Sequence, residues 1–349
     1  MLKPGQQKIK QFYITNFAKI FLIHMERQDV LLNDVVIKFA GDSGDGMQLT
    51  GTQFTNNTAL LGIDLATFPD FPAEIRAPQG TLPGVSGFQL RFSSDRVFTP
   101  GDLCDVLVAM NAAALKANLN SIKKGGKIIA NVDGFDAKNL RLANYADGVN
   151  PLENDSLENY EVIKIDVTKL TREALKEFPE LGMKEKDRAK NMFVLGFLYW
   201  MYNRELDNTI NFLKEKFGNK ENIFNSNVKV LQAGYNYGDT TETFTTRYKV
   251  EKARMQPGIY RSIMGNQALA YGLIAASQRS GLQLFLGSYP VWLTPNNFRK
   301  GQYYETRLLA FSKTAPFYIF WTIEYLCNSH FFQYLGKAYR IKYKWRSGG

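Results

Sequence analysis

The strongest local signal for chemistry is a glycine-rich segment near the start of the chain. It consists of Gly41, Asp42, Ser43, Gly44, Asp45 and Gly46, and it lies between an apolar run and a helix-like stretch. Glycines allow a tight turn and a close approach of the backbone to a ligand, and the following helix favours an anion at its amino end. The two aspartates would instead repel a phosphate, and the spacing differs from the dinucleotide motif. These residues leave two interpretations open, a ligand-binding loop and a tight turn that caps the helix.

A second candidate is the proline-rich stretch 68–80, FPDFPAEIRAPQG. It contains Glu74 and Arg76, which carry opposite charges two residues apart and face the same way if the segment is extended. The pair would then point together toward a ligand or a partner. A solvent-exposed loop without such a role is the alternative.

The residue types exclude several other kinds of chemistry. Two cysteines, Cys104 and Cys327, are too few for a disulfide framework or for an iron–sulfur cluster that takes four thiolates. The two histidines, His24 and His330, lie near the ends, so residues 35–291 contain no histidine to activate a nucleophile. We therefore expect no metal site in this chain and no complete catalytic set in its central part.

The distribution of charge and hydropathy argues against nucleic acid and membranes as partners. The formal net charge is +10, but most of the basic excess lies in residues 292–349, and the central part is close to neutral. A nucleic-acid binder concentrates such an excess on a folded face. The apolar stretch 17–24 is far shorter than the ~20 residues of a membrane span, and no secretory signal is evident. We expect a cytoplasmic protein.

Strands and helices that would position the candidate residues alternate over residues 34–234. The run 35–40 is apolar, as in buried parallel strands, and leads through the glycine-rich segment into a helix at 47–61. Further strands are predicted at 85–92, 105–110, 127–132 and 161–166, and helices at 111–122, 187–203, 205–217 and 219–233. This order predicts an α/β fold with a doubly wound, mostly parallel sheet. We expect positive φ at Gly44 and Gly46 in the turn.

The remaining segments suggest a division into further parts. Residues 1–33 are expected to be a disordered extension, of which 1–24 are dispensable. Residues 235–258 lack a helical period and are interpreted as an ordered linker. A helix at 265–280 and a strand at 282–286 indicate the start of a second α/β domain over 259–291. The aromatic and basic segment 292–349 does not continue that pattern.

Several of these segments resemble a known family. The stretch 34–90, with FAGDSGDGMQLTG at 39–51 and FPDFPAEIR at 68–76, resembles the gamma domain of 2-oxoacid:ferredoxin oxidoreductases, and KNMFVLG at 190–196 looks like a later helix of that domain. YRSIMGNQALA at 260–270 and LFLGSYPV at 284–291 look like the start of the alpha, pyrimidine-binding domain. A gamma domain fused ahead of an alpha domain is similar to the alpha subunit of the 2-oxoglutarate type.

The resemblance implies a function for the chain as a subunit of a larger enzyme. Such enzymes decarboxylate a 2-oxoacid oxidatively with thiamine diphosphate and Mg²⁺ shared with or held by a beta subunit, and coenzyme A takes the acyl group. An iron–sulfur cluster in the partner passes electrons to ferredoxin. The resemblance places Gly41 to Gly46, Glu74 and Arg76 on the ligand side of the gamma domain, and Gly265, Asn266, Tyr289 and Pro290 at the start of the pyrimidine-binding domain. The alternative is a non-catalytic module of doubly wound fold that binds a nucleotide or coenzyme A.

The sequence departs from the family pattern after Val291. In the family, Thr-Pro follows directly, whereas here Trp292 and Leu293 precede Thr294 and Pro295, and the pattern does not resume. This break predicts a truncation or a shift of reading frame after Val291. We therefore expect the chain alone to be inactive, and expect it not to oxidise 2-oxoglutarate even with a beta subunit. Met25 looks like a natural start.

Overall fold

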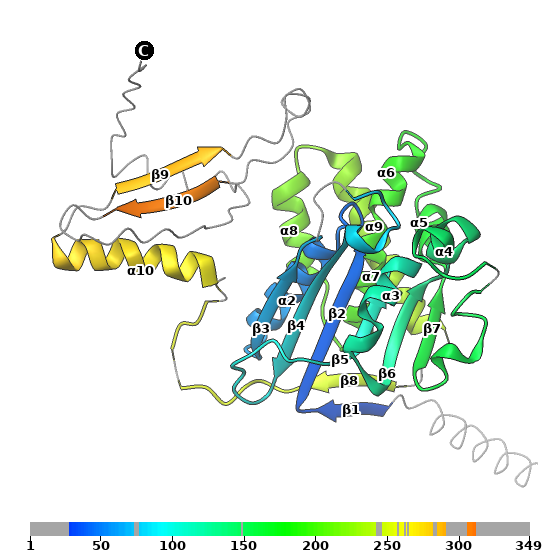
Figure 1. Cartoon of the computed structure of the whole chain (residues 1–349), viewed down its shortest axis with the longest axis horizontal. Helices are drawn as coiled ribbons and strands as arrows, with labels where there is room; N and C mark the ends of the chain where they lie inside the picture. The colour runs from blue at the N-terminus through cyan, green and yellow to red at the C-terminus, as the bar shows by residue number, and fades with distance from the viewer. Residues whose placement is uncertain are drawn as a thin grey trace, which may run out of the picture. The chain divides into compact units, whose positions relative to one another are not determined.

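The computed structural model describes residues 28–72, 77–147, 149–241, 246–256, 258–261, 263, 265–281, 285–290 and 306–311. The chain divides into two compact units, Met1–Tyr260 and Arg261–Gly349 (Figure 1). No helix among the described residues is long and apolar enough to cross a membrane.

The first unit is built on a six-stranded sheet of order β3-β4-β2-β5-β6-β7. Four strands run parallel: β2 (Asp34–Asp42), β5 (Cys104–Ala109), β6 (Ile122–Asn131) and β7 (Glu161–Ile165). On the other side of β2, the strands β4 (Val85–Ser93) and β3 (Asp64–Asp70) extend the sheet with antiparallel pairing. The predicted mostly parallel α/β sheet is confirmed, and β3 is an additional edge strand.

Helices cover both faces of this sheet (Figure 1). On one face, Ile37 and Phe39 of β2 pack in a core with α2 (Met47–Leu60), α7 (Lys190–Met201) and α9 (Glu221–Thr240). On the other face, Val36 and Ala40 pack with α3 (Ala112–Asn118). The fold is therefore doubly wound, because consecutive strands and helices place their helices on opposite faces. The remaining helices among the described residues of this unit are α4 (Ala137–Leu142), α5 (Val167–Ala174), α6 (Met183–Arg188) and α8 (Asp207–Phe217), with 3₁₀ turns η1 (Leu82–Gly84), η2 (Leu119–Ser121), η3 (Val132–Phe135) and η4 (Asp155–Leu157).

Two glycines let α7 and α9 pack with their backbones in contact. A Cβ atom at Gly196 of α7 would collide with the carbonyl oxygen of Leu231, and one at Gly234 of α9 would collide with that of Phe193. The α9 helix also continues past residue 234, since Tyr237 packs against Phe193 and Phe197. The expected end of the domain at 234 therefore falls inside a helix.

A short parallel pair corrects two further expectations. β1 (Gln28–Leu32) pairs with β8 (Thr246–Val250), with Val30 opposite Tyr248. Residues 28–32 are thus ordered, and residues 246–250 of the expected ordered linker form a strand, because backbone hydrogen bonding between the two segments makes each a strand. The Tyr248 ring packs against Tyr202, which attaches the pair to the main core. Residues 1–27 lie outside the described part of the chain.

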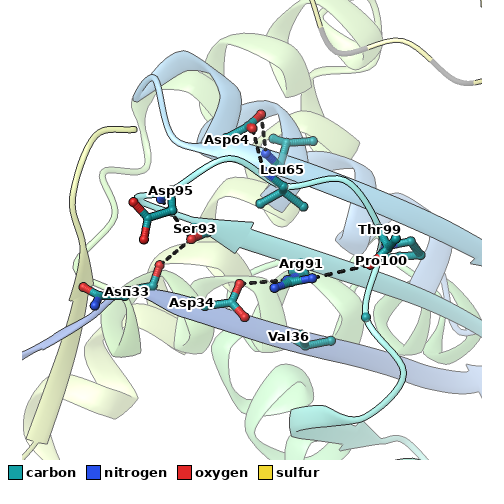
Figure 2. Close-up of polar contacts among 12 residues, drawn as sticks. Asn33, Asp34, Val36, Asp64, Leu65, Arg91, Ser93, Asp95, Thr99 and Pro100 are labelled. Atoms are coloured by element: carbon teal, nitrogen blue, oxygen red, sulfur yellow. Dashed lines mark hydrogen bonds and ion pairs between the residues drawn. The ribbon is translucent and has the colours of Figure 1, made fainter. Parts of the chain in front are cut away.

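Polar contacts fix the amino end of β2 beside β4 (Figure 2). Arg91 of β4 donates from Nε to Oδ1 of Asp34 at 2.9 Å, and the hydroxyl of Ser93 donates to the carbonyl of Asn33 at 2.7 Å. Asp64, the first residue of β3, accepts from the backbone amide of Val97 at 2.8 Å. These contacts anchor the loop after β4 against the starts of two neighbouring strands.

The second unit contains α10 (Gly265–Ser280), β9 (Phe285–Pro290) and β10 (Thr306–Phe311) among its described residues. The helix lies where the sequence predicts it, whereas the strand runs three to four residues later than the predicted 282–286. β10 pairs antiparallel with β9, so six residues of the segment 292–349 form a strand. The sequence break expected after Val291 lies outside the described residues.

Candidate functional site at the carboxyl end of β2

The glycine-rich segment forms the turn between β2 and α2. The backbone amide of Asp45 donates to the carbonyl of Asp42 at 2.9 Å. The amide of Asp42 in turn donates to the Oδ2 atom of Asp45, also at 2.9 Å. These two bonds close the turn on itself, so that one of its backbone amides is already bound by a carboxylate.

The second carboxylate oxygen of Asp45 binds a lysine from a distant helix. Its Oδ1 lies 2.7 Å from Nζ of Lys190, the first residue of α7, and the two side chains are only 12% and 21% exposed. Asp45 therefore neutralises Lys190 and holds the turn against the start of α7. A charged pair this shielded from water is screened less than one at the surface.

Asp42 connects the turn to the proline-rich stretch. Both of its carboxylate oxygens lie 3.0 Å from the backbone nitrogen of Gly80. Burial raises the pKa of Asp42 above its ordinary value, and the negative charge of Asp45 adds to that rise. The bonds from Gly80 and from the Asn111 side chain, together with the charge of Lys190, act in the opposite direction.

The glycines of the turn have different roles. Gly46 has φ of +74°, and a Cβ atom there would lie 2.5 Å from Nδ2 of Asn191. A Cβ atom at Gly41 would lie 2.8 Å from Oδ2 of Asp45. Gly44 is not in the left-handed region, and its nearest neighbour would be Nε2 of Gln79 at 3.4 Å. The expectation of positive φ is thus confirmed for Gly46, the N-cap residue that precedes α2, and wrong for Gly44.

The turn lies at the point where the sheet changes its direction of winding. β2 leads into α2 on one face, and its parallel neighbour β5 leads into α3 on the other. In open α/β sheets, ligands bind in the crevice outside the carboxyl ends of two such strands. The glycine-rich sequence and its position in the sheet therefore both indicate the carboxyl end of β2 as the candidate site.

Two asparagines at this edge of the sheet were not predicted as site residues from the sequence. Asn111 follows β5, accepts from the amide of Ala114 at 2.8 Å as the N-cap of α3, and also bonds to Asp42. Asn131 ends β6, donates to the carbonyl of Met110 at 3.2 Å and accepts from the amide of Val167 at 3.1 Å. Each asparagine comes at the end of a predicted strand, and this position was the signal by which the sequence could have indicated it as a site residue.

The other predicted site residues fall into two groups. Glu74 and Arg76 lie outside the described residues, whereas Gly80, the last residue of the same stretch, donates to Asp42. Gly265 and Asn266 begin α10 and Tyr289 and Pro290 end β9, so all four belong to the second unit. The turn 41–46 and the end of the proline-rich stretch are thus the parts of the prediction that the structure brings together.

Comparison with known proteins identifies the family. The family model described as pyruvate ferredoxin/flavodoxin oxidoreductase matches residues 36–237. The chain belongs to the pyruvate ferredoxin/flavodoxin oxidoreductase family. The matched range begins in β2 and ends in α9, so it contains the six-stranded sheet except for the first two residues of β2, and it contains the candidate site. This confirms the resemblance stated from the motifs.

One sequence relative and one solved structure are similar to this chain. The chain is 53% identical over 262 residues to the 2-oxoglutarate oxidoreductase subunit KorA of Mycobacterium tuberculosis. That match covers 74% of this chain and 39% of the relative, so the chain spans well under half of KorA. The 2-oxoglutarate:ferredoxin oxidoreductase from Magnetococcus marinus, solved with 2-oxoglutarate, coenzyme A and succinyl-CoA, matches with a TM-score of 0.54 and 24% identity. This covers 70% of this chain and 37% of that one, and it shows that the two share a fold.

At the site of this oxidoreductase-family chain, carboxylates bind two backbone amides. The Asp42 amide binds Asp45, and the Gly80 amide binds Asp42. A phosphate at these two amides would have to displace the carboxylates and would meet their negative charge. Among the described residues, no group of three His, Cys, Asp or Glu side chains could hold a metal ion. The described arrangement is a turn braced by two carboxylates.

Proposed function

We propose that this chain is part of a 2-oxoglutarate:ferredoxin oxidoreductase, with a gamma domain followed by the beginning of an alpha domain. In that reaction the 2-oxoacid loses carbon dioxide, coenzyme A receives the acyl group, and an electron pair passes to ferredoxin. The observation that carries the proposal is the 53% identity over 262 residues to KorA. The same identity supports 2-oxoglutarate over pyruvate as the 2-oxoacid.

The cofactors of the reaction are assigned to the complex rather than to this chain's first unit. Thiamine diphosphate, when bound, supplies the carbon nucleophile that attacks the oxo carbon. We propose that a beta subunit holds it, together with Mg²⁺ and an iron–sulfur cluster. Two cysteines in the whole chain are too few for a cluster of four thiolates, which supports that division. Ferredoxin and coenzyme A are reactants found inside cells, so we place the complex in the cytoplasm.

The braced turn has a defined part in this proposal. Because Asp45 binds the Asp42 amide and both aspartates would repel a phosphate, we infer that the turn 41–46 shapes the coenzyme A side of the complex without binding the phosphates of coenzyme A. The hydrogen bond from Gly80 to Asp42 and the ion pair of Lys190 with Asp45 would keep the turn in place while substrates exchange. Glu74 and Arg76, in the adjoining loop, are proposed to face the same side.

A domain exchange tests the function of the first unit directly. Residues 28–260 would replace the corresponding region of KorA, and the hybrid would be produced with the partner subunit of that enzyme. We expect the hybrid to reduce methyl viologen in the presence of 2-oxoglutarate and coenzyme A, and to do so poorly with pyruvate. Unmodified KorA with the same partner is the control for assembly and for the assay.

Assembly is measured alongside activity. The chain itself, tagged and produced with a beta subunit, should retain that subunit through purification, and without it should show no viologen reduction. A hybrid that folds and binds its partner but lacks 2-oxoglutarate-dependent turnover would contradict the proposed function. A hybrid that prefers pyruvate would contradict the substrate assignment alone.

A further inference from the structure

A buried arginine at the opposite end of the sheet has no role in the site described above. Arg204 follows α7 and is only 4% exposed. Its guanidinium lies 5.9 Å from the ring centre of Phe54 and 5.5 Å from that of Phe92. Phe92 pairs with Val35 near the amino end of β2, whereas the turn at Asp42 lies seven residues further along, or about 23 Å. The two places are separate.

The conformation of the chain after α7 fixes Arg204 in this position. Asn203 has φ of +51°, and its backbone amide donates to the carbonyl of Trp200. The backbone amide of Arg204 donates to the carbonyl of Tyr199 at 2.7 Å. These bonds form the usual left-handed termination of a helix. Arg247 of β8 supports it by donating to the carbonyl of Trp200 at 3.2 Å and to Oδ1 of Asn203 at 2.9 Å.

The guanidinium has unused hydrogen-bonding capacity. Neither Nε nor Nη2 of Arg204 has a hydrogen-bond partner among the described residues. Aromatic faces stabilise a cation but accept no hydrogen bonds in the plane of its N–H groups. Burial lowers the pKa of Arg204 to about 10, so the side chain is still charged at neutral pH. An uncompensated buried cation of this kind is costly unless something pairs with it.

In Arg172, the Nε and Nη2 atoms show which groups this edge of a guanidinium binds. Arg172 donates from Nε and Nη2 to the two carboxylate oxygens of Asp187, at 2.7 and 2.9 Å. This side-on, two-bond geometry suits carboxylates and phosphates alike. In Arg204 the corresponding edge has no such partner among the described residues.

Arg204 borders a cavity of about 400 Å³. Three segments distant in sequence line it: the turn 61–63 after α2, residues 202–204 after α7, and residues 249–252 at the end of β8. Lys249 and Lys252 add two positive charges to that of Arg204, against the one carboxylate of Glu251. The cavity has a size found for small-molecule sites and a net positive lining.

We propose that this cavity binds a small oxyanion, a phosphate or carboxylate group, which pairs with Arg204. Nε and Nη2 are shielded from solvent in the described conformation, so binding includes a rotation of the guanidinium that brings this edge to the anion. Lys249 and Lys252 attract the anion at the mouth of the cavity. The site does not depend on the proposed function, because it lies at the other end of the sheet from the turn 41–46.

Titration calorimetry on the full chain tests the site with two probes, inorganic phosphate and malonate, at constant ionic strength set with sodium chloride. We expect saturable binding of at least one probe and a rise of the thermal unfolding temperature with its concentration. The Arg204→Met variant should bind about tenfold more weakly or worse, since it loses two charge-assisted hydrogen bonds. Lys124→Gln, which removes an exposed lysine of β6, is the charge-matched control and should bind as the wild type does.

Replacement of a buried charge by an apolar side chain is often neutral for folding, so Arg204→Met is expected to fold. If it does not, Lys249→Gln with Lys252→Gln, both exposed positions, should weaken binding several-fold without loss of the fold. Binding of phosphate alone or malonate alone would support the site and assign its class. Binding of neither probe, or equal binding by the wild type and all cavity variants, would overturn the proposal.

Discussion

Asp45 and Lys190 form an ion pair of 2.7 Å that joins the turn after β2 to the first residue of α7. The pair spans 145 positions of sequence and is mostly shielded from solvent. It sets the position of the candidate site relative to the helix that fills the main core. Its contribution can be separated from that of an ordinary surface pair.

The Asp45→Asn variant should be destabilised by about 1–3 kcal/mol. The asparagine can still accept the Asp42 amide, but Lys190 loses its counter-charge in a place only 21% exposed. Chemical unfolding in urea measures the loss. The matched control is Asp34→Asn, which breaks the more exposed pair with Arg91 shown in Figure 2 and should cost less than about 1 kcal/mol. Equal losses in the two variants would contradict a special role for the Asp45 pair.

Gly46→Ala should destabilise the protein by roughly 1–3 kcal/mol, because φ of +74° strains any residue with a Cβ atom. The added carbon would also force Asn191 to move. Gly44→Ala is the control in the same turn, with ordinary φ and a nearest contact of 3.4 Å, and its free energy of unfolding should stay close to that of the wild type. Thermal and urea unfolding of both variants provide the comparison. Loss at Gly44 without loss at Gly46 would contradict the described turn.

The raised pKa of Asp42 predicts a dependence of stability on pH. Because the folded protein binds this proton more tightly than the unfolded chain, the free energy of unfolding should fall as pH rises from 3.8 through the folded pKa. Asp42→Asn, which can still accept from Gly80, lacks this titration. The difference in stability between the variant and the wild type should therefore shift in favour of the variant across that window. Urea unfolding at a series of pH values checks it, and parallel curves for the two proteins would refute it.

Cys104 should resist alkylation in the folded protein. The side chain is fully buried, and burial raises the pKa of its thiol to about 11, so very little thiolate is present at pH 8. Treatment with iodoacetamide before and after unfolding in urea, followed by peptide mass mapping, distinguishes the two states. We expect Cys104 to be modified only after unfolding. Rapid modification of Cys104 in the native protein would show that the amino end of β5 opens readily.

The sequence was sufficient for those elements whose signal is local. β2 begins with a nearly continuous apolar run, and residues 41–46, which include its end, combine three glycines with two aspartates, so both the strand and the turn were predictable. β3 was not, because DLATFPD contains a proline and lacks a clear apolar run. Pro69 is tolerated because β3 is an edge strand and pairs on one side with β4.

Features formed by distant segments could not be found from the sequence. β1 and β8 are five residues each and lie more than two hundred positions apart, so neither carries a signal of its partner. The contact of Asn111 with Asp42 depends on β5 lying beside β2. The cavity at Arg204 needs three segments to meet, and nothing in the residues near position 204 indicates it. In each case the missing information is the order of strands in space.

The pairing of β1 with β8 has a consequence for how such enzymes are assembled in evolution. Among the described residues, the first and last strands of the unit lie side by side and run parallel, so Gln28 and Val250 lie within about 17 Å of each other, the length of five extended residues. A unit whose ends are this close can be added to a neighbouring gene, removed or encoded separately with little disturbance to its core. The same sheet domain is thus suited to exist as a free subunit in one enzyme and as a fused segment in another.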